Sequence, residues 1–340
     1  MSPTVGPAGA AEEEDGHRPD GRIRLGGRTD RRPGRPEAAA TAILATMQVA
    51  FIGFGLIAGS AALAIRANKA TEGWTLAAWS PSGDGPRRAA NEGIVDLAAD
   101  APEDAIAGAD LVVLAAPATV CLALIDRLAG PWRARLAEGV VVTDVASTKV
   151  RLVERADAAG LRFVGGHPMA GRETAGYAAA VADLFVDRPW VVVPGALASP
   201  ADVDRVTDLA HACLARVVVM DAAAHDRAVA GISHLPLIVA VALVEAVVGA
   251  TEARAGYGGW PDAAGLAAGG WRDMTRLANG DPVMGAAIVA TNAPALATRV
   301  RDLRAVLDAW LVELERPDGP DEAAIVERLE AARAMLDAAR

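Results

Sequence analysis

Cysteines are scarce and unclustered in this sequence. Cys121 and Cys213 are the only two, and neither stands in a CxxC motif or a Cys/His cluster. Disulfide scaffolds and zinc sites are built from grouped cysteines and histidines. We therefore expect neither a disulfide framework nor a metal, and a chain suited to the reducing cytoplasm.

Positive charge is also in short supply. The 33 lysines and arginines are outnumbered by 43 aspartates and glutamates, giving a formal net charge of −10. Nucleic-acid-binding proteins present a basic face, and none is evident here. Residues 228–250 are apolar but contain His234, Pro236 and Glu245, which favours a buried helix over a membrane span. The expected partner is a small-molecule substrate, not nucleic acid or a membrane.

Aromatic residues make up only 4% of the chain, although hydrophobic residues make up 52%. Alanine and valine carry that hydrophobicity, which predicts a globular, helix-rich protein. Residues 1–46 differ, because they are rich in Gly, Pro, Arg and Glu and have no apolar period. We expect a disordered extension there, without the apolar core of a secretory signal. We expect Met47 to be the working start, with the extension a tail or a start-site misassignment.

From Met47 onward, short apolar runs alternate with helical segments. Continuous apolar runs of this kind are typical of parallel strands covered on both faces. The pattern predicts an α/β fold, a doubly wound Rossmann-type parallel sheet forming a dinucleotide-binding domain over residues 47–220. The expected strands cover residues 48–53, 75–79, 110–116, 139–145, 162–165 and 189–193, with the first helix at 56–66.

After residue 221 the strands stop. Long segments rich in Ala, Val and Leu follow, and they predict an all-helical second domain over residues 221–340, for substrate binding and dimerisation. The expected helices cover residues 221–250, 262–279, 282–314 and 321–339.

A glycine-rich turn directly follows the first expected strand and opens the first helix. Gly53 permits a tight turn, Gly55 lets the backbone approach a pyrophosphate, and the small Ala58 allows close packing of helix on strand. The helix N-terminus offers free N–H groups to the phosphates. The turn therefore predicts a dinucleotide site, whose cofactor-binding residues include Gly53, Phe54, Gly55, Leu56 and Ile57.

The second expected strand ends in Ser80, where an NAD site usually has a carboxylate for the ribose hydroxyls. Arg87 and Arg88 follow. A serine with nearby arginines can accommodate a 2′-phosphate, so we expect NADP to be accepted, with NAD as the other possibility. The arginines would alternatively just coat a helix.

His167 is the strongest candidate catalytic residue among the five histidines. It stands in Gly165–Gly171, just after an expected strand, on the side where ligands of such sheets bind. An imidazole suits proton abstraction from an alcohol as hydride leaves. The alternative is a histidine that stabilises a turn; His17, in the tail, and His211, in a helix, are bystanders.

Ser147 follows another strand, within Asp144–Lys149. It would either cap the next helix or donate a hydrogen bond to substrate or nicotinamide.

Taken together and in order, these motifs resemble the prephenate/arogenate dehydrogenase family of tyrosine biosynthesis. The matching segments are Gly53–Ser60, Asp144–Lys149, Gly166–Gly171 with Glu173, Ile232–Pro236 and Trp271–Ala278. They span residues 47–292, most of the chain. The resemblance implies a homodimer through the helical domain.

The resemblance also implies roles for particular residues. His167 would be the base on the ring hydroxyl of the substrate, and Ser147 would help to position that hydroxyl. Arg276 would pair with a substrate carboxylate, and Glu173 matches a position that forms an ionic gate with that arginine. His234 matches a histidine lining the same pocket.

Local patterns give some of these residues a plainer interpretation. Taken alone, His234 on an apolar helix is more often a core histidine, with a kink at Pro236. Asp273 and Arg276, three residues apart, would form a surface ion pair. The resemblance favours a substrate-binding role for all three. Gly285 departs from the family, in which many members carry tryptophan, and this leaves substrate preference open.

The reaction implied is oxidative decarboxylation of prephenate or arogenate with hydride transfer to NAD(P), giving 4-hydroxyphenylpyruvate or tyrosine. Two alternatives remain. A β-hydroxyacid or imine NAD(P)-dependent reductase would also join a dinucleotide domain to a helical one, but residues 221–340 contain no lysine of the kind hydroxyacid dehydrogenases use. A non-catalytic dinucleotide-sensing protein would not need His167, Ser147 and Arg276. Feedback inhibition by tyrosine stays open.

Overall fold

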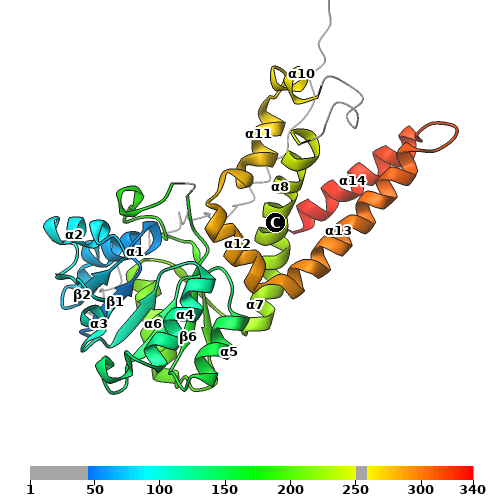
Figure 1. Ribbon diagram of the computed structural model, residues 1–340. Coiled ribbons are helices and arrows are strands. Elements are labelled where there is room, and N and C mark those ends of the chain that lie inside the picture. The colour runs from blue at the N-terminus through cyan, green and yellow to red at the C-terminus, as the bar shows by residue number, and fades with distance from the viewer. Residues whose placement is uncertain (1–44, 173, 250–258, 340) are drawn as a thin grey trace, which may run out of the picture. The chain divides into compact units, whose positions relative to one another are not determined.

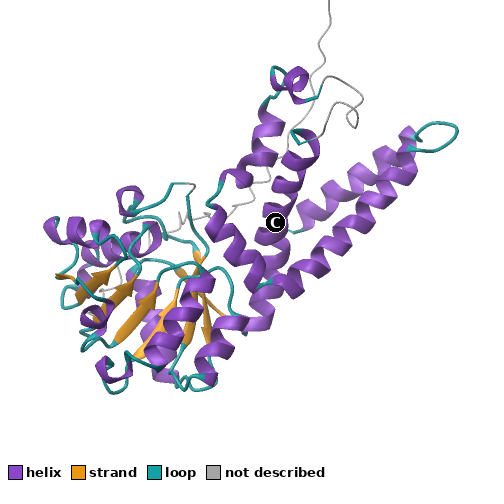
Figure 2. Cartoon of the chain, in the orientation of Figure 1, coloured by secondary structure: helices purple, strands orange, loops and turns teal. Residues whose placement is uncertain are grey.

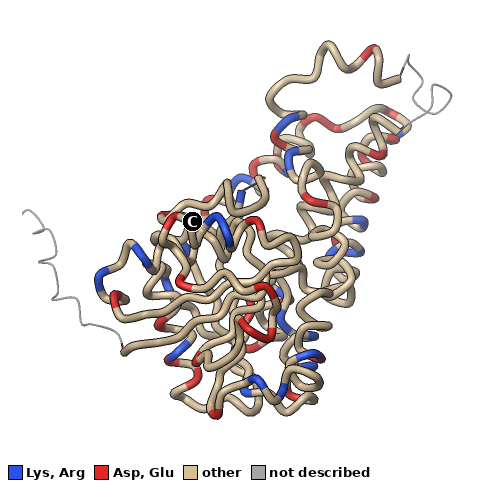
Figure 3. Tube along the Cα trace, turned by 60° about the vertical axis from the view of Figure 1, so that its left-hand side comes forward, with Lys and Arg blue, Asp and Glu red and all other residues tan. Residues whose placement is uncertain are grey.

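The computed structural model describes residues 45–172, 174–249 and 259–339. The expected extension at 1–46 lies almost entirely outside these residues. Within these residues strands occur only up to Val219, and the described part from Ala222 onward is helical, as Figure 2 shows by colour. Basic residues are interspersed with aspartate and glutamate in both parts (Figure 3), and those of the helical part are all arginines.

A parallel five-stranded sheet is the centre of the first part (Figure 1). Its strand order, β3-β2-β1-β4-β5, is that of a doubly wound fold,. The strands are β1 (Gln48–Ile52), β2 (Thr75–Trp79), β3 (Leu97–Ala98), β4 (Leu111–Leu114) and β5 (Val141–Asp144), and every pairing is parallel. The first four expected strands thus form buried parallel strands of this sheet, whereas β3 here and β8 (Arg216–Val219) further on were not among the expected strands.

Helices cover both faces of this sheet. Alternate side chains of the strands enter two separate cores, because successive residues point to opposite faces. Val49 and Phe51 pack with α1 and α6, whereas Ala50 and Ile52 pack with α3, α4 and α5. These helices are α1 (Leu56–Ala67), α3 (Pro102–Ile106), α4 (Ala118–Ala129), α5 (Val150–Ala158) and α6 (Pro200–Ala212), while the short α2 (Asp84–Asn91) follows β2. The expected doubly wound architecture is confirmed.

A second, three-stranded sheet continues from β5. It contains β6 (Val164–Pro168), β7 (Pro189–Pro194) and β8 (Arg216–Val219), and a parallel bridge between Val142 and Phe163 joins it to the first sheet. β7 runs antiparallel to β6, which corrects the expectation of parallel strands throughout. β6 also extends further than expected, so His167 lies inside a strand opposite Val191, not in a loop after one.

The helical part begins with a continuous helical run in three pieces. These are α7 (Ala222–Val229), a π-helical turn η4 (Ala230–His234) and α8 (Leu235–Val247). Pro236 explains the turn, because a proline has no N–H and its ring clashes with the carbonyl four residues earlier in a regular helix. The wider turn removes that conflict, and such turns are often found at functional sites.

The remaining helices are α10 (Trp260–Ala264), α11 (Gly269–Thr275) with the 3₁₀ turn η5 (Arg276–Asn279), α12 (Pro282–Thr291), α13 (Ala293–Leu314) and α14 (Glu322–Ala338). The single helix expected over 282–314 is in fact two, which meet at Asn292 with a bend of 93°. Pro294, in the first turn of α13, lacks the N–H that would continue α12,.

Apolar side chains on the helical part are widely exposed in the single chain. Ala240 is the only buried residue of α8, although residues 222–247 have the length and hydropathy of a membrane span. The expectation of a buried helix is therefore not met within one chain. Exposed apolar residues also mark α13 and α14, among them Leu307, Leu311, Val312, Leu329 and Leu336. Such a surface is typical of helices covered by another subunit.

Candidate active site

Gly53 ends β1 and turns the chain into α1. Its φ of +94° lies in the left-handed region, and a Cβ there would stand 2.2 Å from the carbonyl oxygen of Ala115. Its N–H donates to the carbonyl of Trp79 at 2.8 Å. Strands β2 and β4 thus crowd the turn from both sides, and only glycine fits.

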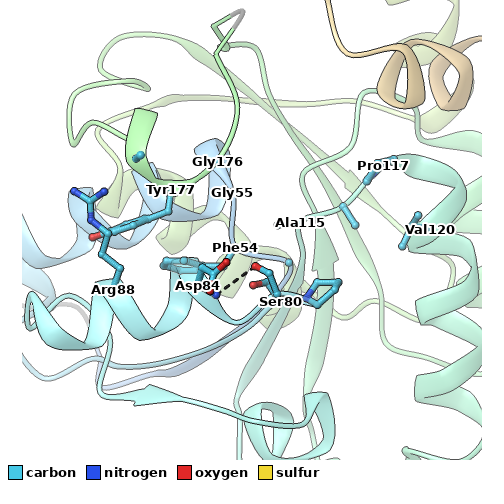
Figure 4. Close-up of a pocket in the computed structure, with 16 residues that line it drawn as sticks. Phe54, Gly55, Ser80, Asp84, Arg88, Ala115, Pro117, Val120, Gly176 and Tyr177 are labelled. Carbon is cyan, nitrogen blue, oxygen red and sulfur yellow. Dashed lines mark hydrogen bonds between the residues drawn. The ribbon is translucent and has the colours of Figure 1, made fainter.

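A cleft of about 590 Å³ opens at the carboxyl ends of β1, β2 and β4. Figure 4 shows Phe54, Ser80 and Asp84 on one side of it and Ala115, Pro117 and Val120 on the other. A Cβ on Gly55 would meet nothing within 4 Å, and the N-terminus of α1 has no side-chain cap. Open space and uncapped N–H groups at one point suit a pyrophosphate. The cleft therefore fits a dinucleotide.

Four of the six predicted cofactor-binding residues line this cleft: Gly53, Phe54, Gly55 and Ser80. Leu56 and Ile57 do not, because they begin α1 and Ile57 packs against the core. Their contribution to cofactor binding stays a prediction.

Both arginines near Ser80 already have partners. Arg87 donates to the carbonyl of Ser82 at 2.7 Å and pairs with Asp84 at 3.0 Å. Arg88 pairs with Glu92 at 2.8 Å and lies over the ring of Tyr177, 5.8 Å from its centroid. Arg88 and Asp84 both line the cleft, so it presents one charge of each sign beside Ser80.

Tyr177 is a cleft residue that the sequence did not indicate. Its ring packs against Phe54 at 5.4 Å between centroids, and its hydroxyl donates to Glu92 at 2.6 Å. Burial and the Glu92 carboxylate raise the pKa of Tyr177 to about 12, so the hydroxyl remains a donor. A Cβ at Gly59 would lie 2.6 Å from this ring, which gives that glycine a packing role.

His167 is buried, with 7% of its surface exposed. Its Nδ1 lies 2.8 Å from Nε2 of His225, whose own Nδ1 lies 2.8 Å from Oδ1 of Asp226. Burial first, and then repulsion of a protonated ring by Lys149 and by the neighbouring histidines His225 and His234, holds the pKa of His167 well below its usual range. The imidazole is therefore neutral near pH 7 and able to accept a proton.

The next helix, α5, is not capped by Ser147. Its first N–H groups, those of Lys149 and Val150, donate to the carboxylate of Asp226 at 2.8 and 2.9 Å. The cap therefore comes from α7, in the helical part. Ser147 is half-buried, and its hydroxyl makes no hydrogen bond among the described residues. The helix-capping interpretation of Ser147 is wrong, and its hydroxyl remains available to a ligand.

Lys149 and Asp144 form a fully buried ion pair. Lys149 Nζ also donates to the carbonyls of Ala146 and Thr148 at 2.9 and 3.0 Å. Asp144 accepts the N–H of Gly166 at 3.2 Å, and a Cβ on Gly166 would lie 2.5 Å from the Asp144 carbonyl oxygen. The pair thus holds the loop that carries Ser147 against the strand that carries His167.

His234 lies in the π-helical turn and is 1% exposed. Asn292 Nδ2 donates to the carbonyl of Asp226 at 2.8 Å and faces His234 Nδ1 at 3.0 Å. Because an amide NH₂ only donates, Nδ1 accepts and Nε2 carries the proton. Nε2 makes no hydrogen bond of regular geometry within the described residues, although the backbone of Ser147 lies next to the ring. Burial, with a smaller effect of His225, lowers the pKa of His234 to about 4, so it is a neutral donor.

The other predicted substrate residues lie in the helical part or outside the described chain. Arg276 begins η5 and Asp273 lies in α11, and both are exposed. Glu173 lies outside the described residues. Gly285 is in α12, where a Cβ would stand 3.7 Å from Leu237. Catalytic and substrate-binding roles for all of these residues stay predictions.

Sequence and structure comparisons decide the family. A family model described as "Prephenate dehydrogenase, nucleotide-binding domain" matches residues 61–219, and one described as "Prephenate dehydrogenase, dimerization domain" matches 221–328. Prephenate dehydrogenase of Bacillus subtilis is 32% identical over 267 residues, which are 78% of this chain and 67% of that protein. The chain belongs to the prephenate dehydrogenase family.

Solved structures agree. Prephenate dehydrogenase from A. aeolicus in complex with hydroxyphenyl propionate and NAD⁺ has a TM-score of 0.76 at 25% identity, covering 87% of this chain and 99% of that one. Arogenate dehydrogenase from Synechocystis has a TM-score of 0.68 at 28% identity, covering 85% and 100%. The expectation of a nicotinamide-dependent dehydrogenase of the tyrosine-forming family is confirmed.

Proposed function

We propose that this prephenate dehydrogenase family member oxidises and decarboxylates prephenate or arogenate, with His167 as the base. The observation that carries the proposal is the buried imidazole of His167. Its Nδ1 lies at hydrogen-bond distance from His225, and the neighbouring Gly166 N–H donates to Asp144 of the Asp144–Lys149 loop. Its depressed pKa keeps it ready to accept a proton at neutral pH,.

The residues around His167 divide the work of the reaction. A bound nicotinamide dinucleotide would supply the hydride acceptor. His167 takes the proton of the substrate hydroxyl through Nε2, the nitrogen without a partner among the described residues. As carbon dioxide leaves and the ring becomes aromatic, the ring oxygen takes that proton back. Aromatisation drives the reaction, so the protein mainly orients the substrate and moves one proton.

Side-chain recognition falls to the helical part. His234 Nε2–H is a buried donor that a substrate oxygen would satisfy, which removes the cost of leaving it unpaired,. Arg276 would pair with a substrate carboxylate, and Asp273 and Glu173 are the further candidates for substrate binding. Ser147, freed from capping α5, would position the hydroxyl that reacts.

The preferred cofactor follows from the end of β2. Ser80 stands where a carboxylate would bind the ribose hydroxyls, and Arg88 lines the same cleft, which supports acceptance of NADP beside NAD,. Asp84 opposes a phosphate there. Measuring kcat/KM with NAD and with NADP tests whether NADP is accepted. A kcat/KM about a hundredfold higher with NAD, a difference of about 2.7 kcal/mol, would contradict the proposal. Ser80→Asp is expected to shift the preference toward NAD.

Two further proposals concern the oligomeric state of the protein and its cellular compartment. The exposed apolar faces of α8, α13 and α14 support a homodimer, and sedimentation that shows a monomer at all concentrations would contradict it. The free thiols Cys121 and Cys213, both buried, support a cytoplasmic enzyme,.

Steady-state kinetics of the purified chain test the proposed function. Prephenate and arogenate should each be supplied with NAD and NADP, and formation of reduced nicotinamide followed. Turnover of at least one substrate is expected. Tight cofactor binding without turnover of either would instead support a dinucleotide-sensing protein.

A further inference from the structure

Three side chains form an unbroken hydrogen-bonded chain between the two parts of the protein. His167 lies in β6, whereas His225 and Asp226 lie in α7. The two contacts, His167 Nδ1 to His225 Nε2 and His225 Nδ1 to Asp226 Oδ1, both measure 2.8 Å. All three side chains are buried.

The direction of each hydrogen bond follows from the last member. A carboxylate only accepts, so Nδ1 of His225 donates to Asp226. In a neutral ring the other nitrogen then accepts, so Nε2 of His225 accepts from Nδ1 of His167. His167 is therefore held in the tautomer whose Nε2 has a free lone pair. That is the form a base needs.

We propose that His225 and Asp226 form a proton relay behind His167. The inference rests on the proposed function, in which His167 Nε2 takes the proton of the substrate hydroxyl. As the bond from that proton to Nε2 forms, the Nδ1–H bond of His167 breaks and its proton joins Nε2 of His225. His225 then carries both ring protons, and His167 is neutral again. The same steps reverse when the ring oxygen takes a proton back, so no proton is gained or lost.

Electrostatics favours the relay. The groups near these rings are the Lys149 ammonium, which is paired with Asp144, the Asp226 carboxylate and the neutral His234. A positive charge kept on His167 would be repelled by Lys149. On His225 the same charge would lie 2.8 Å from the Asp226 carboxylate. In a buried site the difference between these two places is large.

Asp226 is itself held firmly for this task. Its carboxylate also accepts the N–H groups of Lys149 and Val150, and its carbonyl accepts from Asn292 at 2.8 Å. The anion that would stabilise a charged His225 therefore cannot rotate away.

Two substitutions at His225 separate a relay from simple packing. His225→Gln places an amide oxygen near the former Nε2, so it still accepts from His167 Nδ1 but cannot take up a proton. His225→Leu removes both functions. His211→Gln, on the exposed side of α6, is the matched control. Cofactor binding, measured for every variant, shows that each is folded.

The two His225 variants are expected to lower kcat by different factors. We expect kcat to fall about tenfold in His225→Gln and on the order of a hundredfold or more in His225→Leu, within the range for loss of base catalysis. KM and the control should change little. In the unliganded protein, nitrogen-15 spectra of the histidines should show the Nδ1–H tautomer of His167, and His225→Gln should keep it.

Each opposite result is informative. A kcat in His225→Gln equal to wild type would exclude proton uptake by His225, and the Nε2–H tautomer in the wild type would exclude the chain of hydrogen bonds. If His167→Asn retains turnover, the proposed function fails. If His167→Asn loses turnover while both His225 variants keep it, only the relay fails.

Discussion

The carboxylate of Asp226 accepts the backbone N–H of Lys149 at 2.8 Å, so a side chain from the helical part caps a helix of the dinucleotide-binding part. The same carboxylate holds His225, and through it His167. A second link, between the hydroxyls of Thr148 and Thr291 at 2.8 Å, lies beside it. The Asp144–Lys149 loop, which carries Ser147, is thus fixed by residues on both sides of the junction.

Removing the charge of Asp226 should weaken both connections. We expect Asp226→Asn to lower the free energy of unfolding by about 1–3 kcal/mol, because a buried charge-assisted cap is lost, and to reduce kcat. Asp221→Asn is the control, since Asp221 caps α7 at the surface through Ala224 at 2.7 Å and asparagine caps equally well. Urea denaturation gives the free energy of unfolding of both variants. Equal losses in the two variants would contradict the role of Asp226 as the cap of α5.

Lys149 should be needed for stability as well as for position. Lysine occurs only at positions 69 and 149 of this arginine-rich sequence, and at 149 it is fully buried against Asp144. Lys149→Met leaves that carboxylate buried and unpaired, which should cost about 3–5 kcal/mol. Adding Asp144→Asn should recover part of the loss. Chemical denaturation of the two single variants and the double variant gives the coupling, and strict additivity would show that the two residues do not interact.

Two glycines of the same turn should respond differently to alanine. Gly53→Ala is expected to lower stability by at least about 1–3 kcal/mol, because φ is +94° and the Cβ would meet the Ala115 carbonyl,. Gly55→Ala should leave stability within about 0.5 kcal/mol, since its Cβ has open space,. That Cβ should nonetheless weaken cofactor binding. Thermal unfolding and cofactor titration test the pair, and equal stability of the two variants would contradict this account.

Acidification should destabilise the protein through His234. The pKa of His234 is about 4 in the folded chain against 6.5 for an ordinary histidine. Between these values the unfolded state binds a proton that the folded state does not. The free energy of unfolding therefore falls as pH is lowered from 6.5 to 4. His167 acts in the same direction. His234→Gln should flatten this dependence, and an unchanged slope would contradict the burial of His234.

Much of the fold could be predicted because burial leaves a direct pattern. The parallel strands were readable as apolar runs, and Gly53 as a turn residue. The direction of β7 was not, since an antiparallel buried strand is as apolar as a parallel one,. Motifs indicated Gly53, which lines the cleft, and also Ser147 and His167, whose catalytic roles stay predictions. His225 lies 58 residues from its partner His167, and no local pattern indicates such a contact. The role of Tyr177 likewise depends on packing across distant segments.

The central claim is that His167 is the base of a dehydrogenase acting on prephenate or arogenate. The most direct measurement is kcat of His167→Asn beside that of the wild type, with the affinity for the dinucleotide measured in both. The account predicts a fall in kcat of about 10² to 10⁴, with cofactor affinity almost unchanged. Wild-type turnover in His167→Asn would contradict it.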